Sequence, residues 1–330
     1  MTKRPKARIY RGTPHNLAFL AARLRAGDLV AVPTETVYGL AANALDPLAC
    51  ARIFRAKGRP TTDPLIVHIH TFAQLRAMGE PNPAAMNLAR RFWPGPLTLV
   101  LRKKSAVPNI VTAGKSSVAV RMPSHPLFRR LLKLARIPLA APSANAFGYV
   151  SPTTAKHVRD GLGGRIAHIL DGGPSEIGLE STIIDVRKPR LPRLLRPGAI
   201  TLHDVEQVLR VRVRRLRRPA VPATENQAQI APGLLARHYS PHTPVAIHRK
   251  INRTDPTEEA FVFLRKPAGP RQPNVYWLDA RGNLKGAARR LFAVLRRIDA
   301  MQFKKIHVEL APGHGIATAI NDRLRRAAAR

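Results

Sequence analysis

The stretch VPTETVYGLAANALDPLACARIFRAKGRP, from Val32 to Pro60, decides the fold of the first part of the chain. An apolar strand predicted over Leu29–Pro33 enters a threonine-rich loop, and a helix predicted over Leu48–Lys57 follows. A buried strand, a polar loop and a helix in this order indicate an α/β domain. Lys57 and Arg59 lie close together in the sequence, and few acids nearby could pair with them. The sequence therefore leaves open which anion these two cations bind.

Similar patterns continue through about residue 210. Further helices are predicted at 17–24, before Gly27, and at 84–93, 126–135 and 152–159, the last with Ser151 as N-cap and Pro152 as first residue. Strands are predicted at 97–101, 117–122, 166–170, 182–186 and 191–195. Residues 1–210 are therefore predicted to form one mixed α/β domain.

The remaining sequence changes character. Residues 211–243 have weak periodicity, many prolines and clustered charge, which is typical of a linker. The Pro232–Gly233 pair resembles a hinge, so this linker is predicted to close over a site as a lid. Strand patterns in VAIH, AFVFL, VYWL and KIHVEL, with helices around 284–298 and 316–328, predict a small Rossmann-like α/β domain over 244–330. In the first of these helices, the solvent-facing side is predicted to carry Arg289, Arg290, Arg296 and Arg297.

Composition limits the classes of function. There are 56 Lys and Arg against 20 Asp and Glu, a formal charge of +36, which favours polyanionic partners although GC-rich coding also produces arginine. The single cysteine, Cys50, excludes an internal disulfide framework and a multi-cysteine zinc module, and it indicates a reducing compartment. The basic N-terminus lacks the apolar core of a secretory signal, and no run is long enough to span a membrane. A cytoplasmic protein without membrane partners is expected.

The chemistry is expected in the loops of the first domain, which combine cations, hydroxyls and one histidine, His68. If the flanking strands share a sheet, these loops converge on one basic cavity. The sequence has no paired carboxylates, no His/Cys metal spacing, no Gly-x-Ser-x-Gly elbow and no Walker signature. Arginine forks and Ser/Thr hydroxyls remain, and they suit a ligand that bears phosphate or carboxylate.

Taken in order, the loop segments resemble a known family. PTETVYGL, KGRP, PLIVHI, FWPGPLTLVL, VAVRMPSHP, APSAN, LDGG, GLESTIID and LLRPGAI are similar to the YrdC-like domain of threonylcarbamoyl-AMP synthases. RHYSPHTP and AINDRLRRAA resemble the linker and C-terminal domain of the two-domain long form. The resemblance implies a YrdC-like mixed twisted sheet with helices around a basic cavity, followed by the small Rossmann-like domain.

The resemblance also implies an activity. The family is a nucleotidyltransferase that makes L-threonylcarbamoyl-AMP and pyrophosphate from L-threonine, bicarbonate or CO2, and ATP. Its product supplies the threonylcarbamoyl group for the adenosine beside the anticodon of tRNA, so hand-off to a separate transferase and proximity to tRNA are expected. Because acids are scarce, Mg²⁺ is expected to be held mainly by the ATP phosphates, with no metal site made by the protein.

Residue roles carry over where the motifs match. The implied threonine-binding residues are Thr34, His68, Arg121, Ala141 and Ser181. The implied ATP-binding residues are Arg59, Asp63, Ser117, Ser143, Asn145, Ser151, Arg196 and Tyr239, and the implied catalytic residues are Lys57 and Arg59. Thus Thr34 would face one substrate while Lys57 and Arg59 face the phosphates of the other.

Position 63 departs from the family, because relatives commonly carry Asn where this chain has Asp63. Its carboxylate could repel phosphate, cap a turn or help to hold Mg²⁺. Apart from the resemblance, His68 also fits a core histidine, the loop hydroxyls fit turn formers, and Arg121 and Arg196 fit surface charges. Two other functions stay open: a basic RNA-binding module without catalysis, and a carbamoyl-transfer relative of hydrogenase maturation proteins, which the single cysteine disfavours.

Overall fold

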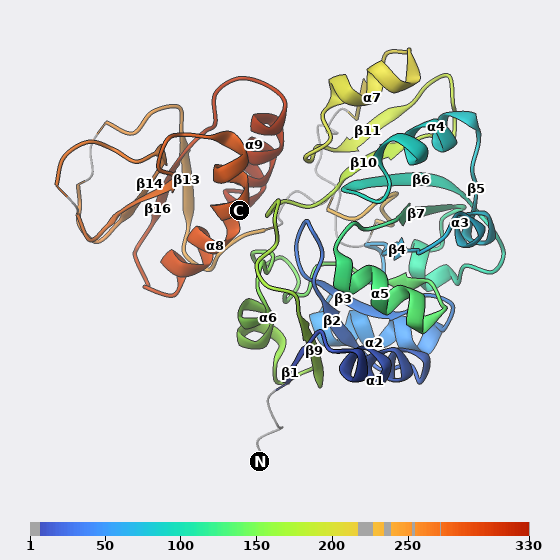
Figure 1. The fold of residues 1–330 in the computed structure, drawn as a ribbon. Coiled ribbons are helices and arrows are strands. Elements are labelled where there is room, and N and C mark those ends of the chain that lie inside the picture. Colours follow the sequence, from blue (N-terminus) through green and yellow to red (C-terminus); the bar gives the residue numbers. More distant parts are fainter. Residues whose placement is uncertain (1–6, 217–226, 234–238, 253–254, 271, 330) are drawn as a thin grey trace.

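The computed structural model describes residues 7–216, 227–233, 239–252, 255–270 and 272–329. These residues form two α/β units, one around a large mixed sheet and one around a small parallel sheet (Figure 1). Within this part of the chain, no helix has the length and apolar content needed to cross a membrane. The α/β class and the separate small C-terminal unit predicted from the sequence are confirmed.

The large sheet is twelve-stranded and mixed, in the order β1-β9-β2-β3-β8-β4-β7-β6-β10-β11-β12, with β5 paired to β6. Its strands are β1 (Arg8–Arg11), β2 (Val30–Val32), β3 (Gly39–Asn43), β4 (Ile66–His68), β5 (Gly79–Glu80), β6 (Leu97–Lys103), β7 (Ser117–Arg121), β8 (Leu139–Ala140), β9 (His168–Asp171), β10 (Thr182–Asp185), β11 (Arg193–Arg196) and β12 (Arg214–Arg215). β12 lies inside the predicted linker and extends this sheet by pairing with β11. The sheet therefore brings together strand ends from the whole first two-thirds of the chain.

Helices cover both faces of the large sheet. They are α1 (Pro14–Arg25), α2 (Pro47–Lys57), α3 (Phe72–Met78), α4 (Pro83–Phe92), α5 (Pro126–Ala135), α6 (Ala155–Leu162) and α7 (Leu202–Leu209), with a 3₁₀ turn at Asn109–Thr112. In β2, Val30 and Val32 pack into the core formed with α1 and α5, whereas Ala31 packs into the core on the other face. This alternation follows from the two-residue period of a strand, so both faces of the sheet are buried.

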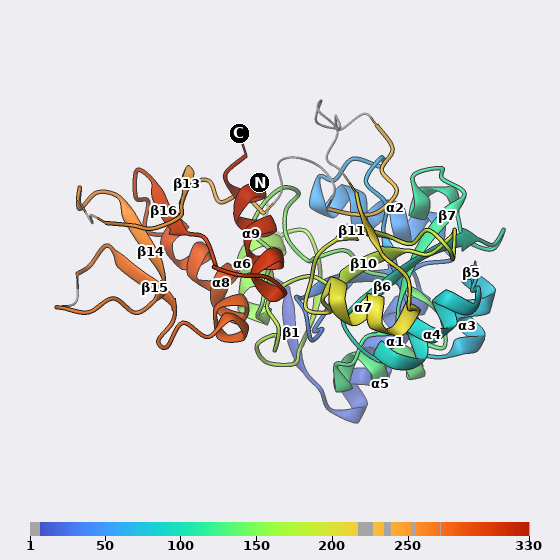
Figure 2. The same cartoon turned by 90° about the horizontal axis from the view of Figure 1, so that it is seen from above.

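The small sheet is parallel, in the order β13-β16-β14-β15. Its elements are β13 (Val245–His248), β14 (Ala260–Arg265), β15 (Val275–Asp279), α8 (Leu284–Asp299), β16 (Ile306–Glu309) and α9 (Ile316–Ala327). Figures 1 and 2 show α8 and α9 on the side of the small sheet that faces the large unit. Both helices thus contribute to the contact between the two units.

Two local predictions were wrong. The helix predicted from Pro152 begins at Ala155, because Thr154 caps it by accepting a hydrogen bond from the backbone N–H of His157. Ser151 instead donates its hydroxyl to Glu180. Arg296 was predicted to face solvent, but it is 9% exposed and donates to backbone carbonyls of the first unit. Arg289, Arg290 and Arg297 are exposed as predicted.

Candidate active site

Loops from distant parts of the large unit converge on one cavity at the ends of β4, β7, β10 and β11. Its lining consists of Thr34, Thr36, Val37, Gly39, Arg59, Ile66, His68, Arg121, Ala141, Pro142, Ser143, Glu180, Ser181, Arg196, Pro232, Gly233 and Tyr239. Nine of the predicted site residues are in this lining: Thr34, Arg59, His68, Arg121, Ala141, Ser143, Ser181, Arg196 and Tyr239. Three arginines and one neutral histidine therefore face the same space, together with several hydroxyls.

Arg121, the last residue of β7, is held by an acid that sequence reasoning missed. Its Nη2 lies 2.6 Å from Oε1 of Glu35, its Nη1 donates to Thr36 Oγ1 at 2.9 Å, and its Nε donates to the Gly95 carbonyl. Burial alone would raise the pKa of Glu35, but the charge and hydrogen bond of Arg121 outweigh it and lower that pKa. The site therefore contains a guanidinium that already binds one carboxylate oxygen.

Thr34 and Ser181 both use their hydroxyls inside the site. Thr34 Oγ1 donates to the Val37 carbonyl at 2.6 Å and accepts from the Val37 N–H, which fixes its own turn. Ser181 Oγ is hydrogen-bonded to Thr98 Oγ1 at 2.7 Å and accepts from Arg196 Nη2 at 3.1 Å. Each hydroxyl is thus oriented before any ligand arrives.

Lys57 and Arg59 flank the helix end at Gly58, which adopts φ 65° in the left-handed region. Lys57 Nζ donates to the carbonyls of Ser143 and Asn145, each at 2.6 Å, and it is not part of the cavity lining. Burial, followed by the charge of Arg59, lowers the pKa of Lys57 well below its ordinary value. In this structure Lys57 ties α2 to the loop after β8.

Asp63 is an acid that pairs with Arg59, so one of the two cations at the end of α2 has a carboxylate partner within the protein. The Arg59 Nη2 to Asp63 Oδ2 distance is 3.0 Å, and Arg59 also donates to the carbonyls of Asp63 and Pro64. Burial raises the pKa of Asp63, although the positive charge of Arg59 acts in the opposite direction. None of the three roles suggested for Asp63 from the sequence is this one.

His68, at the end of β4, is buried against the ring of Phe128. Its Nδ1 lies 3.2 Å from the Ile66 carbonyl, which makes Nδ1 the protonated nitrogen of a neutral ring. Burial, with the charge of Arg121 next in importance, lowers the pKa of His68 to about 3. At neutral pH this histidine is a hydrogen-bonding group and not a cation.

Four predicted residues lie outside the lining besides Lys57. Asp63 and Ser151 are one contact away, bonded to the lining residues Arg59 and Glu180. Asn145 donates to the carbonyls of Ala146 and Tyr149 and shapes its own loop. Ser117 begins β7, whose last residue is Arg121, so the two are about 13 Å apart along the strand. The structure therefore does not bring Ser117 to the cavity.

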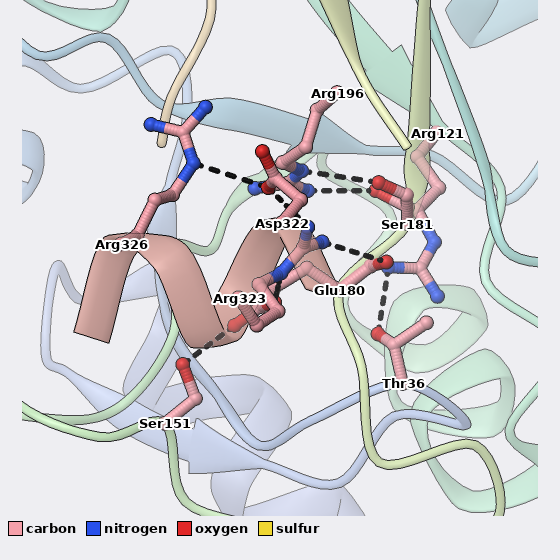
Figure 3. Close-up of polar contacts among 9 residues, drawn as sticks. All are labelled: Thr36, Arg121, Ser151, Glu180, Ser181, Arg196, Asp322, Arg323 and Arg326. Atoms are coloured by element: carbon pink, nitrogen blue, oxygen red, sulfur yellow. Dashed lines mark hydrogen bonds and ion pairs between the residues drawn. The ribbon is translucent and has the colours of Figure 1, made fainter. Parts of the chain in front are cut away.

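Glu180 is a second functional candidate that sequence reasoning missed. It lines the cavity, accepts from Ser151 Oγ at 2.6 Å and accepts from Arg323 Nε at 2.7 Å (Figure 3). The available signal was composition. Acids are scarce in this chain, and Glu35 and Glu180 each stand inside an apolar, hydroxyl-rich loop segment. Buried acids in such surroundings require partners, which here are arginines.

Comparisons with known proteins agree with this geometry. A family model described as telomere recombination matches residues 22–198, and one described as threonylcarbamoyl-AMP synthase, C-terminal domain, matches residues 200–329. A threonylcarbamoyl-AMP synthase of Pyrococcus abyssi is 42% identical over 320 residues, which cover 93% of this chain and 92% of the relative. One of Bacillus subtilis is 40% identical over 329 residues, with 94% and 92% covered.

The structure matches those of solved relatives over nearly its whole length. The crystal structure of P. abyssi Sua5 complexed with L-threonine has a TM-score of 0.87 and 38% sequence identity, covering 98% of each chain. Both domains of that protein therefore have counterparts here. The chain belongs to the two-domain threonylcarbamoyl-AMP synthases, a family of enzymes that make an adenylate intermediate.

Proposed function

We propose that this chain is a nucleotidyltransferase that forms L-threonylcarbamoyl-AMP and pyrophosphate from L-threonine, bicarbonate or CO2, and ATP. The observation that carries the proposal is the single cavity lined by Arg59, Arg121 and Arg196 together with Ser and Thr hydroxyls. In the reaction, a carbamate oxygen attacks the α-phosphorus of ATP and pyrophosphate leaves. Such a transfer depends mainly on positioning and on neutralising oxygen charge, which arginines can do without a strong base.

In this proposal, L-threonine binds near Arg121, His68, Thr34, Ser181 and the backbone at Ala141. Arg121 would take the substrate carboxylate as a fork, and its present contact with the Glu35 carboxylate supports that preference. With Nδ1 facing the Ile66 carbonyl, the Nε2 of neutral His68 would accept the hydrogen bond of the threonine hydroxyl. A polar partner for that hydroxyl would reject amino acids that lack it.

In the same proposal, ATP would bind near Arg59 and Arg196. Ser143 and Tyr239 line the same cavity, which supports a role for them in binding ATP. Asp63, Asn145 and Ser151 would act through the residues they contact, and Lys57 would act by holding the Ser143 loop. Ser117 belongs to this group by family resemblance alone.

Mg²⁺ is proposed to accompany ATP. Among the described residues, no group of three or more His, Cys, Asp or Glu side chains could hold a metal ion. The buried carboxylates at the cavity are each paired with an arginine: Asp63 with Arg59, Glu35 with Arg121 and Glu180 with Arg323. The residues therefore fit an ion that is held by the phosphates, whose charge it would help to neutralise.

The linker is proposed to close the nucleotide side as a lid. Pro232, Gly233 and Tyr239 line the cavity, and Gly233 adopts φ 76°, as a hinge glycine can. Residues 234–238 between them lie outside the described residues. Replacing Tyr239 with Ala should raise the apparent KM for ATP while leaving that for threonine nearly unchanged. If the ATP kinetics of this variant are unchanged, the proposal that the linker closes over the nucleotide is wrong.

The wider role also follows from the family. The adenylate would pass to a tRNA threonylcarbamoyl transferase in the cytoplasm, and the +36 charge would favour proximity to tRNA. A catalytically inactive RNA-binding module is the competing proposal. It predicts RNA affinity that falls steeply with salt and does not respond to threonine.

Pyrophosphate release by the purified chain tests the function directly. ATP and Mg²⁺ are supplied with threonine and bicarbonate singly and together, and the adenylate is identified by mass spectrometry. Release that requires both additions, with threonylcarbamoyl-AMP detected, supports the synthase. Release that is independent of threonine, from a folded protein that binds RNA, would overturn it in favour of the binding module.

A further inference from the structure

The hydrophobic core of the C-terminal domain includes side chains from the loops of the candidate active site. Val37, Val150, Leu179 and Tyr239 are buried in one cluster with residues of α8 and α9 such as Phe292. The rings of Tyr239 and Phe292 stack at 5.6 Å. Three site loops and the linker therefore share a core with the second domain, and this core is not shared with the large sheet.

Polar contacts fix the same loops from the same side. Arg296 of α8 donates from Nη2 to the Val150 carbonyl at 2.5 Å and from Nε to the Ser151 carbonyl at 3.3 Å. Tyr149 donates to Asp299 at the end of α8. The C-terminal domain thus holds the backbone on both sides of Ser151, a residue expected on the ATP side.

Arg323 of α9 makes the most direct connection. Its side chain is fully buried, and its Nε donates to Glu180 Oε2 at 2.7 Å. The other oxygen of Glu180 accepts from Ser151 Oγ at 2.6 Å. Figure 3 shows Arg323 projecting from α9 toward Glu180, with Ser151 and the Ser181–Arg196 pair on either side.

The guanidinium of Arg323 is itself oriented by two neighbours. Asp322 accepts from Arg323 Nη1 at 2.8 Å and also from Arg326 Nε at 3.1 Å. The Tyr239 ring lies 5.2 Å from the Arg323 guanidinium carbon. Because all of these groups are buried or nearly so, the network has few alternative arrangements.

Stability alone explains this network poorly. A buried ion pair often stabilises no more than apolar side chains of similar volume, since both charges lose their hydration. The apolar cluster beside it already joins the two domains. Glu180, however, lines the cavity next to Ser181, so a shift of its carboxylate would change both the position of Ser151 and the charge that faces the ligand.

We propose that Arg323 is a positioning residue of the active site, through which the C-terminal domain holds Glu180 and Ser151 in the arrangement that binds ATP. The inference rests on the proposed synthase function. Without Arg323, the Glu180 carboxylate would be free to turn toward the cavity, where it would repel the phosphates and release Ser151. The ATP side should therefore weaken more than the threonine side.

The test compares Arg323→Gln with Arg325→Gln in the full chain. Arg325 lies two residues further along α9 and is exposed, so this control loses the same charge without touching the site. Arg323→Gln is expected to raise the apparent KM for ATP about ten-fold or more, as loss of a charge-assisted hydrogen bond implies, with a smaller change for threonine. Arg325→Gln should match the wild type. A wild type that makes no threonylcarbamoyl-AMP would refute the proposed function itself.

A double-variant cycle separates positioning from a loss of folded protein. If Arg323 acts through Ser151, combining Arg323→Gln with Ser151→Ala should raise the KM for ATP no further than the more severe single variant does. Adding Glu180→Gln to Arg323→Gln should recover part of the ATP affinity, since it removes the unpaired charge. Full additivity with Ser151→Ala, or no recovery by Glu180→Gln, would overturn the proposal.

Arg323→Gln leaves a buried carboxylate without its cation and could fail to fold. In that case the same kinetic measurement is made on Arg323→Lys, which keeps the positive charge but loses the planar guanidinium fork. It is expected to raise the KM for ATP by an intermediate factor. A folded Arg323→Lys protein with wild-type ATP kinetics, or one in which only kcat falls in proportion to folded protein, would assign Arg323 a purely structural role.

Discussion

At the scale of single residues, the three contacts of the Arg121 guanidinium allow its role in binding threonine to be tested. Arg121→Lys keeps the charge but cannot bind Glu35, Thr36 and the Gly95 carbonyl together. We expect the apparent KM for threonine to rise about ten-fold, the value for losing one charge-assisted hydrogen bond, while the KM for ATP changes little. Steady-state kinetics with each substrate varied in turn would measure both constants.

The matched control for that variant is Arg102→Lys, in the neighbouring strand β6, where the arginine is exposed. It should leave both constants unchanged. Equal effects of Arg121→Lys on the two KM values would mean that Arg121 does not belong to the threonine side.

His68 predicts how stability depends on pH. Its native pKa of about 3 lies below the ordinary value of 6.5, because burial disfavours the charged ring. Above pH 6.5 both the folded and unfolded states are neutral. Below it the unfolded state takes up a proton that the folded state refuses. The unfolding free energy should therefore fall as the pH drops from 6.5 toward 4, by about 1.4 kcal/mol per pH unit for this group.

Urea unfolding at a series of pH values would test this dependence. His157, whose pKa burial lowers to about 4, adds its own share to the slope. His68→Gln should make the slope shallower, because it removes the buried ring whose pKa is lowered in the folded state. If the slope is the same in His68→Gln, His68 takes up its proton over the same pH range in the folded and unfolded states, which would contradict the prediction.

At the scale of elements, the sequence predicted those with strong local signals. α5 matches its predicted range, since Pro126 begins it and four of its apolar residues face the core. β3 and β8 were not predicted, because GLAAN and LA have no alternation and both of their faces are buried. The start of α6 was misplaced because Ser151 and Thr154 are both good caps, and Glu180 takes the Ser151 hydroxyl.

Some features of the candidate site could likewise be predicted from the sequence, and others could not. Convergence of the loops on one cavity could be predicted, because strands that share a sheet bring their ends together. The pairing of Glu35 with Arg121 and of Glu180 with Arg323 could not, since each joins elements far apart in sequence. Arg296 was misassigned for a related reason. The face of α8 that carries it packs against the other domain and not solvent.

The end of α2 offers a prediction about one element. Gly58 adopts φ 65°, and a Cβ added there would meet no atom within 4 Å. Gly58→Ala should therefore cost about 1–2 kcal/mol of unfolding free energy from backbone strain alone. Gly58→Asn should cost less, because asparagine adopts this conformation more readily. Urea unfolding of the two variants measures the difference. If the two variants lose the same unfolding free energy, the left-handed conformation of residue 58 is not the cause of the loss.

At the scale of the whole molecule, a small part of the positive charge is buried inside the protein. Among the residues that the structure describes, six arginines are buried: Arg59, Arg121, Arg196, Arg296, Arg323 and Arg326. They bind carbonyls or acids in the cavity wall and between the domains. The net charge therefore overstates the basic surface available to RNA, and part of it serves the docking of the C-terminal domain.

That docking depends on close approach of two backbones at Gly178. This glycine adopts φ 75°, and a Cβ there would lie 2.5 Å from the Arg289 carbonyl oxygen and 2.7 Å from that of Ala288, both in α8. A helix backbone cannot yield as a side chain does, so Gly178→Ala must push the two domains apart or distort the loop before Ser181. We expect it to destabilise the protein and to raise the apparent KM for ATP in the same direction as Arg323→Gln.

Gly173 provides the matched control, because it adopts φ 77° and a Cβ there would meet nothing within 4 Å. Both alanine variants carry the same strain from the left-handed conformation, about 1–2 kcal/mol. The excess loss of unfolding free energy in Gly178→Ala therefore measures the clash with α8, expected at about 1–3 kcal/mol for overpacking. If the two variants lose equal stability and keep equal ATP kinetics, the contact with α8 is loose, and the C-terminal domain cannot position the site through this loop.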